Sequence, residues 1–177
     1  MKKILALTVL LFSFVIVKAQ SSKMNAVKIN PLSALVATGN IAYERAVGAQ
    51  TSVQLGVFYS GFKSSSLKYE GFGITPEFRY YISKENGPMN GVYVGPFARY
   101  QQFSIKDKSD GSSVKFSSVG GGALIGWEKA WKSGFVLDIF AGPSYNAGKF
   151  KDGQEEDLAF GFDGFSVRTG ITIGFAF

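Results

Sequence analysis

Several ionisable residues stand at alternate positions within otherwise apolar segments of this 177-residue sequence. Neighbouring carboxylates can act as an acid and a base, whereas a carboxylate beside a guanidinium forms an ion pair. The acids are Glu44, Glu77, Glu128 and Asp138, and the bases are Arg79, Arg99 and Arg168, joined by Lys28 if its segment is a strand. Because acids and bases nearly balance, we expect an ion-pair network inside a barrel. The alternative is that these residues lie near strand ends in water.

The sequence contains no His and no Cys. It therefore lacks the base of a Ser-His or Cys-His pair, the thiolates of a zinc site and any disulfide. It also shows no phosphate-binding glycine loop and no metal-ligand spacing. We expect no enzyme activity, no metal and no cofactor.

The elements that must position these charges are strands, and the last segment, 165–177, shows this best. Its odd positions are apolar or aromatic, except for Thr169, and its even positions are small or polar. Such a period of two is typical of a strand with two different faces. Similar segments lie around residues 25–33, 41–44, 52–59, 72–82, 92–99, 119–128 and 135–142. The sequence thus predicts about eight strands, the first of them interrupted by Pro31.

The links between these segments alternate in length. The short links are residues 47–50, 84–90 and 130–133, and the longer polar links are 61–70, 106–113 and 147–164. The first link, 34–39, is short although it belongs with the longer ones. Outer-membrane barrels have short periplasmic turns, longer external loops and an even number of strands. The pattern predicts an eight-stranded antiparallel up-and-down transmembrane β-barrel with both termini in the periplasm.

The first residues resemble a secretory signal peptide. Lys2 and Lys3 precede an apolar run of about 14 residues, which is shorter than the roughly 20 needed for a membrane-spanning helix. We expect cleavage after Ala19, which divides the chain into a signal peptide, 1–19, and one barrel domain, 20–177. The mature chain is then only weakly basic, so no nucleic-acid binding is expected.

The polar faces distinguish a membrane barrel from a soluble one. Glycines dominate these faces, whereas the outer surface of a soluble barrel needs charge. An eight-stranded barrel has room inside only for side chains, so small residues suit its interior. The glycines concerned are Gly56, Gly73, Gly95, Gly120, Gly122, Gly142, Gly170 and Gly174.

The sequence ends on an aromatic strand. Exposed aromatic strand ends favour aggregation in soluble proteins. Ile173, Phe175 and Phe177, at alternate positions, instead resemble the C-terminal signal that barrel-assembly machinery reads. We expect that machinery to be a partner during biogenesis.

Two short runs carry a family resemblance. Residues 30–33 (NPLS) with 40–45 (NIAYER), and later 76–81 (PEFRYY) with 91–96 (GVYVGP), resemble the DUF3575 group of outer-membrane barrels found in Bacteroidota. The resemblance is specific over residues 25–104 and generic beyond them. It implies an eight-stranded outer-membrane barrel and no particular activity.

Among functions, a structural or surface-binding barrel in the outer membrane is preferred, with a filled lumen and a monomeric state. A narrow or gated channel is the alternative, and a soluble periplasmic lipocalin-like ligand-binding barrel is the second alternative. Lysines in or flanking the longer links could contact lipopolysaccharide, although simple solvation would also explain them. They are Lys63, Lys68, Lys106, Lys108 and Lys115.

Overall fold

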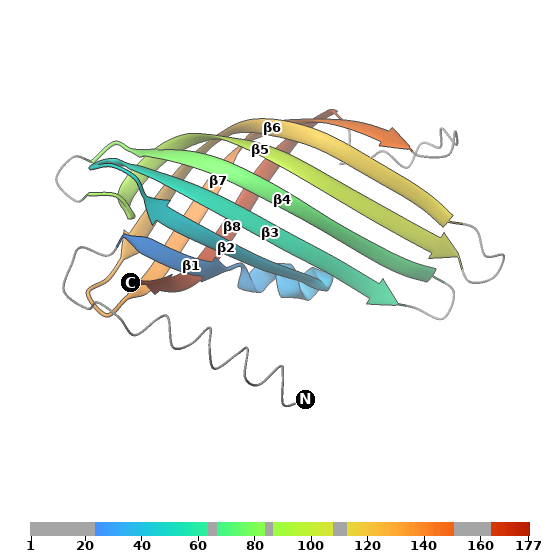
Figure 1. Ribbon diagram of the computed structural model, residues 1–177, viewed down its shortest axis with the longest axis horizontal. Coiled ribbons are helices and arrows are strands. Elements are labelled where there is room, and N and C mark those ends of the chain that lie inside the picture. The colour runs from blue at the N-terminus through green and yellow to red at the C-terminus, as the bar shows by residue number, and fades with distance from the viewer. Residues whose placement is uncertain (1–23, 64–66, 84–86, 108–112, 151–163) are drawn as a thin grey trace.

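The computed structural model describes residues 24–63, 67–83, 87–107, 113–150 and 164–177. Within these ranges the chain forms one closed barrel in which each strand pairs with its neighbour in sequence and β1 pairs with β8 (Figure 1). All pairings are antiparallel. The prediction of an eight-stranded antiparallel barrel is therefore confirmed. The predicted signal peptide, 1–19, lies outside the described residues.

The strands differ in length. The first two are short, and β3 to β8 are longer than the roughly 9–11 residues that span a bilayer. The elements are β1 (Asn25–Ile29), η1 (Pro31–Val36), β2 (Thr38–Ala46), β3 (Thr51–Lys63), β4 (Leu67–Tyr81), β5 (Asn90–Asp107), β6 (Ser113–Ala130), β7 (Phe135–Phe150) and β8 (Gly164–Ala176).

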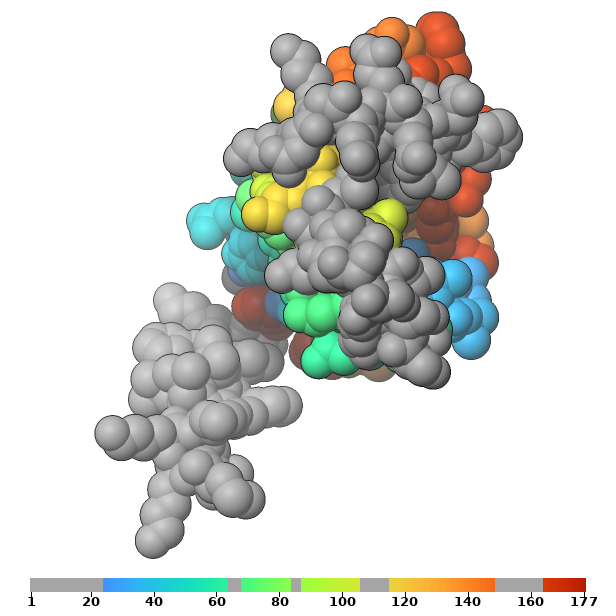
Figure 2. Space-filling view, turned by 90° about the vertical axis from the view of Figure 1, so that its right-hand side faces the viewer, coloured from blue at the N-terminus to red at the C-terminus, as the bar shows by residue number. Residues whose placement is uncertain are grey.

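The barrel has two distinct ends. The turn end carries the links 47–50 and 131–134 and residues 82–83 and 87–89. The start of β1 and the last residue also lie here, where Asn25 and Phe177 exchange main-chain hydrogen bonds of 3.0 and 2.8 Å. The loop end is the opposite end, toward the right of Figure 1. Figure 2 looks onto it and shows η1, in light blue, at the edge of the barrel.

The first strand is shorter than predicted. It ends at Ile29, because Pro31 begins a 3-10 helix instead of continuing the ladder. The Asn30 side chain caps this helix by accepting hydrogen bonds from the amides of Leu32 and Ser33. η1 contacts both β2 and β8. Pro31, which was predicted to interrupt the first strand from within, therefore begins a helix.

The predicted long links are also shorter than expected. Strand pairing continues through residues 61–63 and 67–70, and β5 and β7 extend to Asp107 and Phe150. The sequence prediction was wrong here because polar residues in a strand that projects past the apolar band look like loop residues. The described part of the loop end is therefore built largely of paired strand.

Side chains alternate between the two faces of the wall as predicted. Outward positions carry exposed apolar residues, and inward positions carry small, aromatic or charged residues. Two inward glycines make room for rings: a Cβ on Gly126 would lie 2.4 Å from the Tyr93 ring, and one on Gly170 would lie 2.4 Å from the Phe140 ring.

Prolines on the outer face interrupt the ladder between β4 and β5. Pro76 and Pro96 face outward, and the regular pairing of the two strands is broken beside them. At this point Gly95 comes so close to β4 that a Cβ would lie 1.9 Å from the Phe78 carbonyl oxygen. Only glycine fits this approach without a backbone shift.

Among the described residues, no helix is long and apolar enough to cross a membrane.

Candidate functional site

The charged inward residues meet in the half of the barrel nearest the turn end. Register brings Glu128 of β6 directly opposite Asp138 of β7, and Asp138 directly opposite Thr172 of β8. Two carboxylates placed opposite each other repel unless cations separate them. Lys28 and Arg79 reach this pair from β1 and β4, from other parts of the wall.

Lys28 lies at the centre of three carboxylates. Its ammonium contacts Glu44, lies 3.1 Å from Oε1 of Glu128 and lies 3.1 Å from Oδ2 of Asp138. An ammonium has three protons to donate, so each carboxylate can receive one. All four side chains are fully buried.

Arg79 binds the same three acids and a fourth. Its Nη1 lies 3.1 Å from Glu44, 2.9 Å from Glu128 and 2.9 Å from Asp138. Its Nε donates to Glu77 over 2.6 Å. One guanidinium therefore contacts carboxylates from β2, β4, β6 and β7.

Hydroxyl groups satisfy further carboxylate oxygens. Ser52 donates to Glu44 over 2.5 Å, and the Tyr81 hydroxyl lies 2.7 Å from Glu44. Tyr93 donates to Asp138 over 2.9 Å, and Thr172 is 3.4 Å from the same carboxylate. With these residues, each of the eight strands contributes at least one side chain to the cluster. We call this set the central ion cluster: Lys28, Glu44, Ser52, Arg79, Tyr81, Tyr93, Glu128, Asp138 and Thr172.

A second ion pair lies on the loop-end side of this cluster. Arg168 donates to the remaining oxygen of Glu77 over 2.8 Å and lies 4.5 Å from the Phe97 ring centroid and 4.8 Å from that of Phe140. Cations over aromatic faces gain a favourable electrostatic contact. Glu77 thereby joins Arg168 to Arg79.

On the turn-end side, an apolar layer covers the cluster. It consists of Ala26, Ala46, Met89, Val136 and Ala176, all nearly inaccessible to solvent. Met89 has a left-handed backbone, with φ of 62°, which places a residue of the 82–89 link in the barrel mouth. Non-glycine residues rarely adopt this conformation.

Six of the seven predicted lumen residues lie in this connected set: Glu44, Glu77, Arg79, Glu128, Asp138 and Arg168. Arg99 differs. Its Nε lies 3.3 Å from the Thr75 hydroxyl, and it has no carboxylate partner among the described residues.

Sequence reasoning underrated Lys28 and missed Tyr81, Tyr93 and Met89. Alternation places both tyrosines on inward faces, so their position was available, but their hydrogen bonds depend on contacts across the lumen. Nothing in the sequence marks Met89 as the residue that fills the turn-end mouth.

The predicted C-terminal signal residues lie where β8 closes the barrel. Phe175 pairs in register with both Val27 and Phe135 and is 49% exposed on the outer face. Ile173 is partly buried and pairs with Ile29 and Leu137. Phe177 follows the strand and is held by Asn25.

Four of the five predicted lysines, Lys63, Lys68, Lys106 and Lys115, are strand residues rather than loop residues. Lys63 and Lys68 are register partners, and Lys68 forms a 2.8 Å ion pair with Glu70. Lys115 is exposed on β6. For Lys106 only the main chain is described, and Lys108 lies outside the described residues.

The central ion cluster exposes no group to a substrate: Nη2 of Arg79 has no hydrogen-bond partner within the described part of the chain, but it is buried. Each carboxylate contacts one or more cations, and the ion-pairing side chains are inaccessible to solvent. No group of acidic residues among those described has a metal-binding arrangement. The cluster is best suited to joining strands across the barrel.

Comparisons with known proteins give a family and one similar solved structure. No curated protein matches the sequence. Among solved structures, the chain is similar to Neisserial surface protein A at 15% identity and a TM-score of 0.45, over 87% of this chain and 95% of that chain. Residues 6–156 match the model of a family of proteins of unknown function, DUF3575. As this match covers most of the chain, the protein belongs to the DUF3575 family.

Proposed function

We propose that the protein is an outer-membrane barrel with a closed lumen that acts as a structural or surface-binding scaffold. The observation that carries this proposal is the central ion cluster, which draws on all eight strands and is sealed from solvent. Such a cluster joins opposite walls of the barrel, so it blocks a continuous water path.

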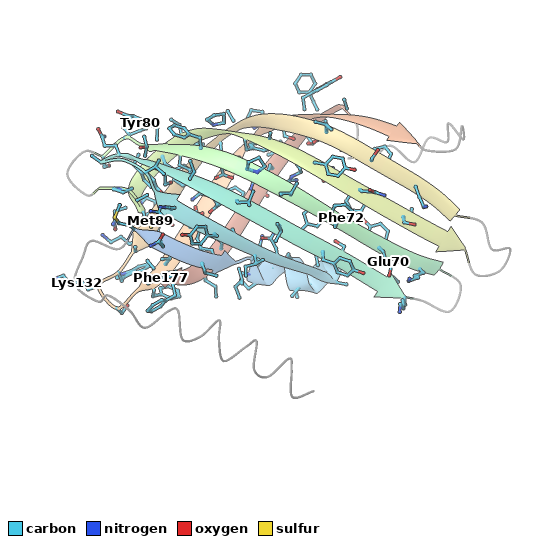
Figure 3. The ribbon with its side chains drawn as sticks, in the orientation of Figure 1. Glu70, Phe72, Tyr80, Met89, Lys132 and Phe177 are labelled. Carbon is cyan, nitrogen blue, oxygen red and sulfur yellow. The ribbon has the colours of Figure 1, made fainter. Side chains whose placement is uncertain are left out.

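The outer face supports a membrane location. On β4 the outward residues from Phe72 to Tyr80 are apolar, and Glu70 follows immediately toward the loop end (Figure 3). At roughly 3.3 Å per residue this apolar stretch is about 26 Å long. A strand tilt near 40° reduces its height to about 20 Å, close to the roughly 25 Å apolar band of outer-membrane barrels.

The ends of the barrel suggest an orientation. The turn end has short links and holds both ends of the barrel domain, as the periplasmic side of such barrels does. Tyr43, Tyr80 and Trp131 are outward near this end, where aromatic residues suit the membrane interface. We infer that the turn end faces the periplasm.

The C-terminal strand supports a role in assembly. β8 closes the barrel against β1 through a short register from Ile173 to Ala176. The outward aromatic ring of Phe175 lies on this closing strand. We infer that Ile173, Phe175 and Phe177 are read by the barrel-assembly machinery before the barrel closes.

Planar-bilayer recording tests the closed lumen against the channel alternative. We expect no stable conductance steps of porin size from the purified, folded protein. The matched variant is Met89→Gly, which opens the apolar layer but leaves the central ion cluster intact, and we expect it to remain closed. A steady open channel in the native protein would overturn the proposal.

Cell fractionation with heat-modifiable gel mobility tests the membrane location. An outer-membrane barrel fractionates with the membrane, and its mobility changes on boiling. The soluble lipocalin-like alternative requires a protein in the soluble periplasmic fraction. The arrangement of side chains in the barrel wall favours the membrane location, since apolar residues face outward and ionised residues face inward.

We propose no enzymatic activity and no cofactor. The buried carboxylates are all paired with cations or hydroxyl groups. A surface or structural role depends instead on the outer wall and on the loop end, which a rigid barrel would present.

A further inference from the structure

A small polar hollow lies on the wall between β5 and β6, toward the loop end. It has a volume of about 120 Å³. Its lining residues are Tyr100, Gln102, Lys115, Phe116 and Ser117. All except Phe116 carry an amine, amide or hydroxyl group.

Register places these polar side chains together on the outer face. Gln102 of β5 is directly opposite Ser117 of β6. Tyr100 lies two residues before Gln102 and Lys115 two residues before Ser117, so all four side chains are on the outward face. The Tyr100 hydroxyl lies 3.4 Å from Oε1 of Gln102. Lys115 is exposed and has no ion pair among the described residues. Only Phe116 belongs to the inward face, where it is buried.

The hollow lies at the loop-end edge of the apolar band of the outer face. Tyr100 packs against Phe72 of β4, with ring centroids 6.1 Å apart, and its register partner Val119 is 61% exposed. Phe72 is the last apolar outward residue of β4 before Glu70 (Figure 3). An acyl chain lying along the band would therefore place its head group beside Lys115.

The chemistry of the hollow suits a phosphate group. The ammonium of Lys115, the amide NH₂ of Gln102 and the hydroxyl of Ser117 can donate hydrogen bonds to phosphate oxygens, whereas the Tyr100 hydroxyl donates to Oε1 of Gln102. Charge-assisted bonds of this kind are the strongest that such a surface can offer.

We infer that this hollow binds a phosphate of lipopolysaccharide, with the lipid chains lying on the apolar band below. The inference rests on the proposed membrane location and on the loop end facing outward, the side that holds lipopolysaccharide. A second cationic position on the same rim favours a lipid with more than one phosphate. Lys63 and Lys68 pair in register on β3 and β4, and the single carboxylate of Glu70 lies near these two cations and forms an ion pair with Lys68.

Native mass spectrometry of the folded full-length mature protein tests the site. Lipid A is titrated against the native protein and the double variant Lys115→Gln, Ser117→Val. We expect lipid A affinity to fall roughly tenfold, since the variant removes the charge and one hydroxyl donor. The matched control is Lys129→Gln, an outward basic residue of β6 near the turn end, which should bind lipid A like the native protein.

A parallel titration with phosphatidylglycerol separates the two sources of lipid phosphate. Binding of lipid A that the double variant leaves unchanged would overturn the site. Equal affinity for phosphatidylglycerol and lipid A would overturn the assignment to lipopolysaccharide. Heat-modifiable mobility confirms that each variant is folded, and the single variant Lys115→Gln provides a milder test of the same residue.

Failure of this inference is distinguishable from failure of the proposed function. If the protein is found in the soluble fraction, both the proposed function and the lipopolysaccharide site are contradicted. If the protein is in the membrane and does not conduct, but its variants bind lipid A like the native protein, only the lipopolysaccharide site is contradicted.

Discussion

The polar side chains inside the barrel are connected differently in its two halves. Near the turn end, Lys28 of β1 contacts acids of β6 and β7, and Arg79 of β4 contacts acids of β2, β6 and β7. Near the loop end, the inward polar contacts between strands that the structure describes join neighbouring strands. Examples are Thr38 with Ser60, Gln101 with Ser118, and Asn146 with Ser166.

Side-chain length and charge explain this difference. Long side chains of lysine, arginine and glutamate can reach across an eight-stranded barrel, whereas serine, threonine and asparagine reach only the adjacent strand. A buried ion needs a partner of opposite charge, so the two buried cations of the turn-end half, Lys28 and Arg79, pair with the buried carboxylates there. In the turn-end half, side-chain contacts cross the lumen and connect strands that are not neighbours, which we call cross-bracing. In the loop-end half, the described side-chain contacts connect neighbouring strands. Mutations that separate these two kinds of connection test the comparison.

The largest effect is expected from Arg79→Ala. This change leaves four buried carboxylates with one fewer cation, and loss of one partner of a buried ion pair costs about 3–5 kcal/mol. The free energy of unfolding should fall by that amount, or folding should fail. Denaturant titration of the protein folded in detergent micelles, followed by heat-modifiable mobility, measures it. Arg79→Lys keeps a charge and should recover part of the loss, and a loss below about 1 kcal/mol in Arg79→Ala would contradict the cross-bracing.

A smaller loss in the free energy of unfolding is expected from Gly95→Ala. This change tests the close approach of β5 to β4 beside the outward prolines Pro76 and Pro96. The new Cβ would lie 1.9 Å from the Phe78 carbonyl oxygen, so the backbone must shift, at a cost of about 1–3 kcal/mol. The matched control is the inward-facing Gly56→Ala, whose nearest contact is an ordinary 3.7 Å. The same denaturant titration compares them. Equal stability of the two variants would show that the close approach carries no constraint.

Arg168→Gln should have a moderate effect. It removes the 2.8 Å ion pair with Glu77, but Arg79 still holds that carboxylate and the Arg168 side chain is 12% exposed. We expect a loss of about 1–2 kcal/mol, near the lower limit for hydrogen bonds to charged groups. The double variant Arg79→Ala, Arg168→Gln should lose more than the sum of the single changes, because it leaves the buried Glu77 carboxylate without either of its two cations. Strict additivity would separate Arg168 from the network.

The smallest effect is expected from Ser118→Ala in the loop-end half. It removes one neutral hydrogen bond of 3.1 Å from Gln101, between adjacent strands. A loss of about 1 kcal/mol follows from the typical net value of such a bond. Denaturant titration at matched detergent concentration measures it. A loss as large as that of Arg79→Ala would remove the distinction between the two halves.

Much of the barrel could be predicted from alternation, and the exceptions have local causes. Pro31 looked like an interruption within a strand, but the Asn30 cap and the fixed φ of proline start a helix instead. Strand ends at residues 61–63 and 67–70 looked like loops, because their polar side chains match either structure. The polarity of a segment indicates whether its side chains face water, and it says less about whether the backbone is a strand or a loop.

The candidate site was predictable in its members but not in its connections. Glu44, Arg79, Glu128 and Asp138 could be assigned to inward faces because alternation is a property of each strand alone. That Lys28 lies at the centre of the acids, whereas Arg99 has no acidic partner among the described residues, could not be read from the sequence.

The sequence by itself determined the strand period, the face on which each residue lies and the near balance of inward charge. These properties depend on residues close together in the chain. The tertiary structure decided which charges meet, because that depends on the register of eight strands and on closure between β1 and β8. Register sets how far each side chain stands along the barrel axis, and closure brings Lys28 next to acids that lie 100 and 110 residues away in sequence.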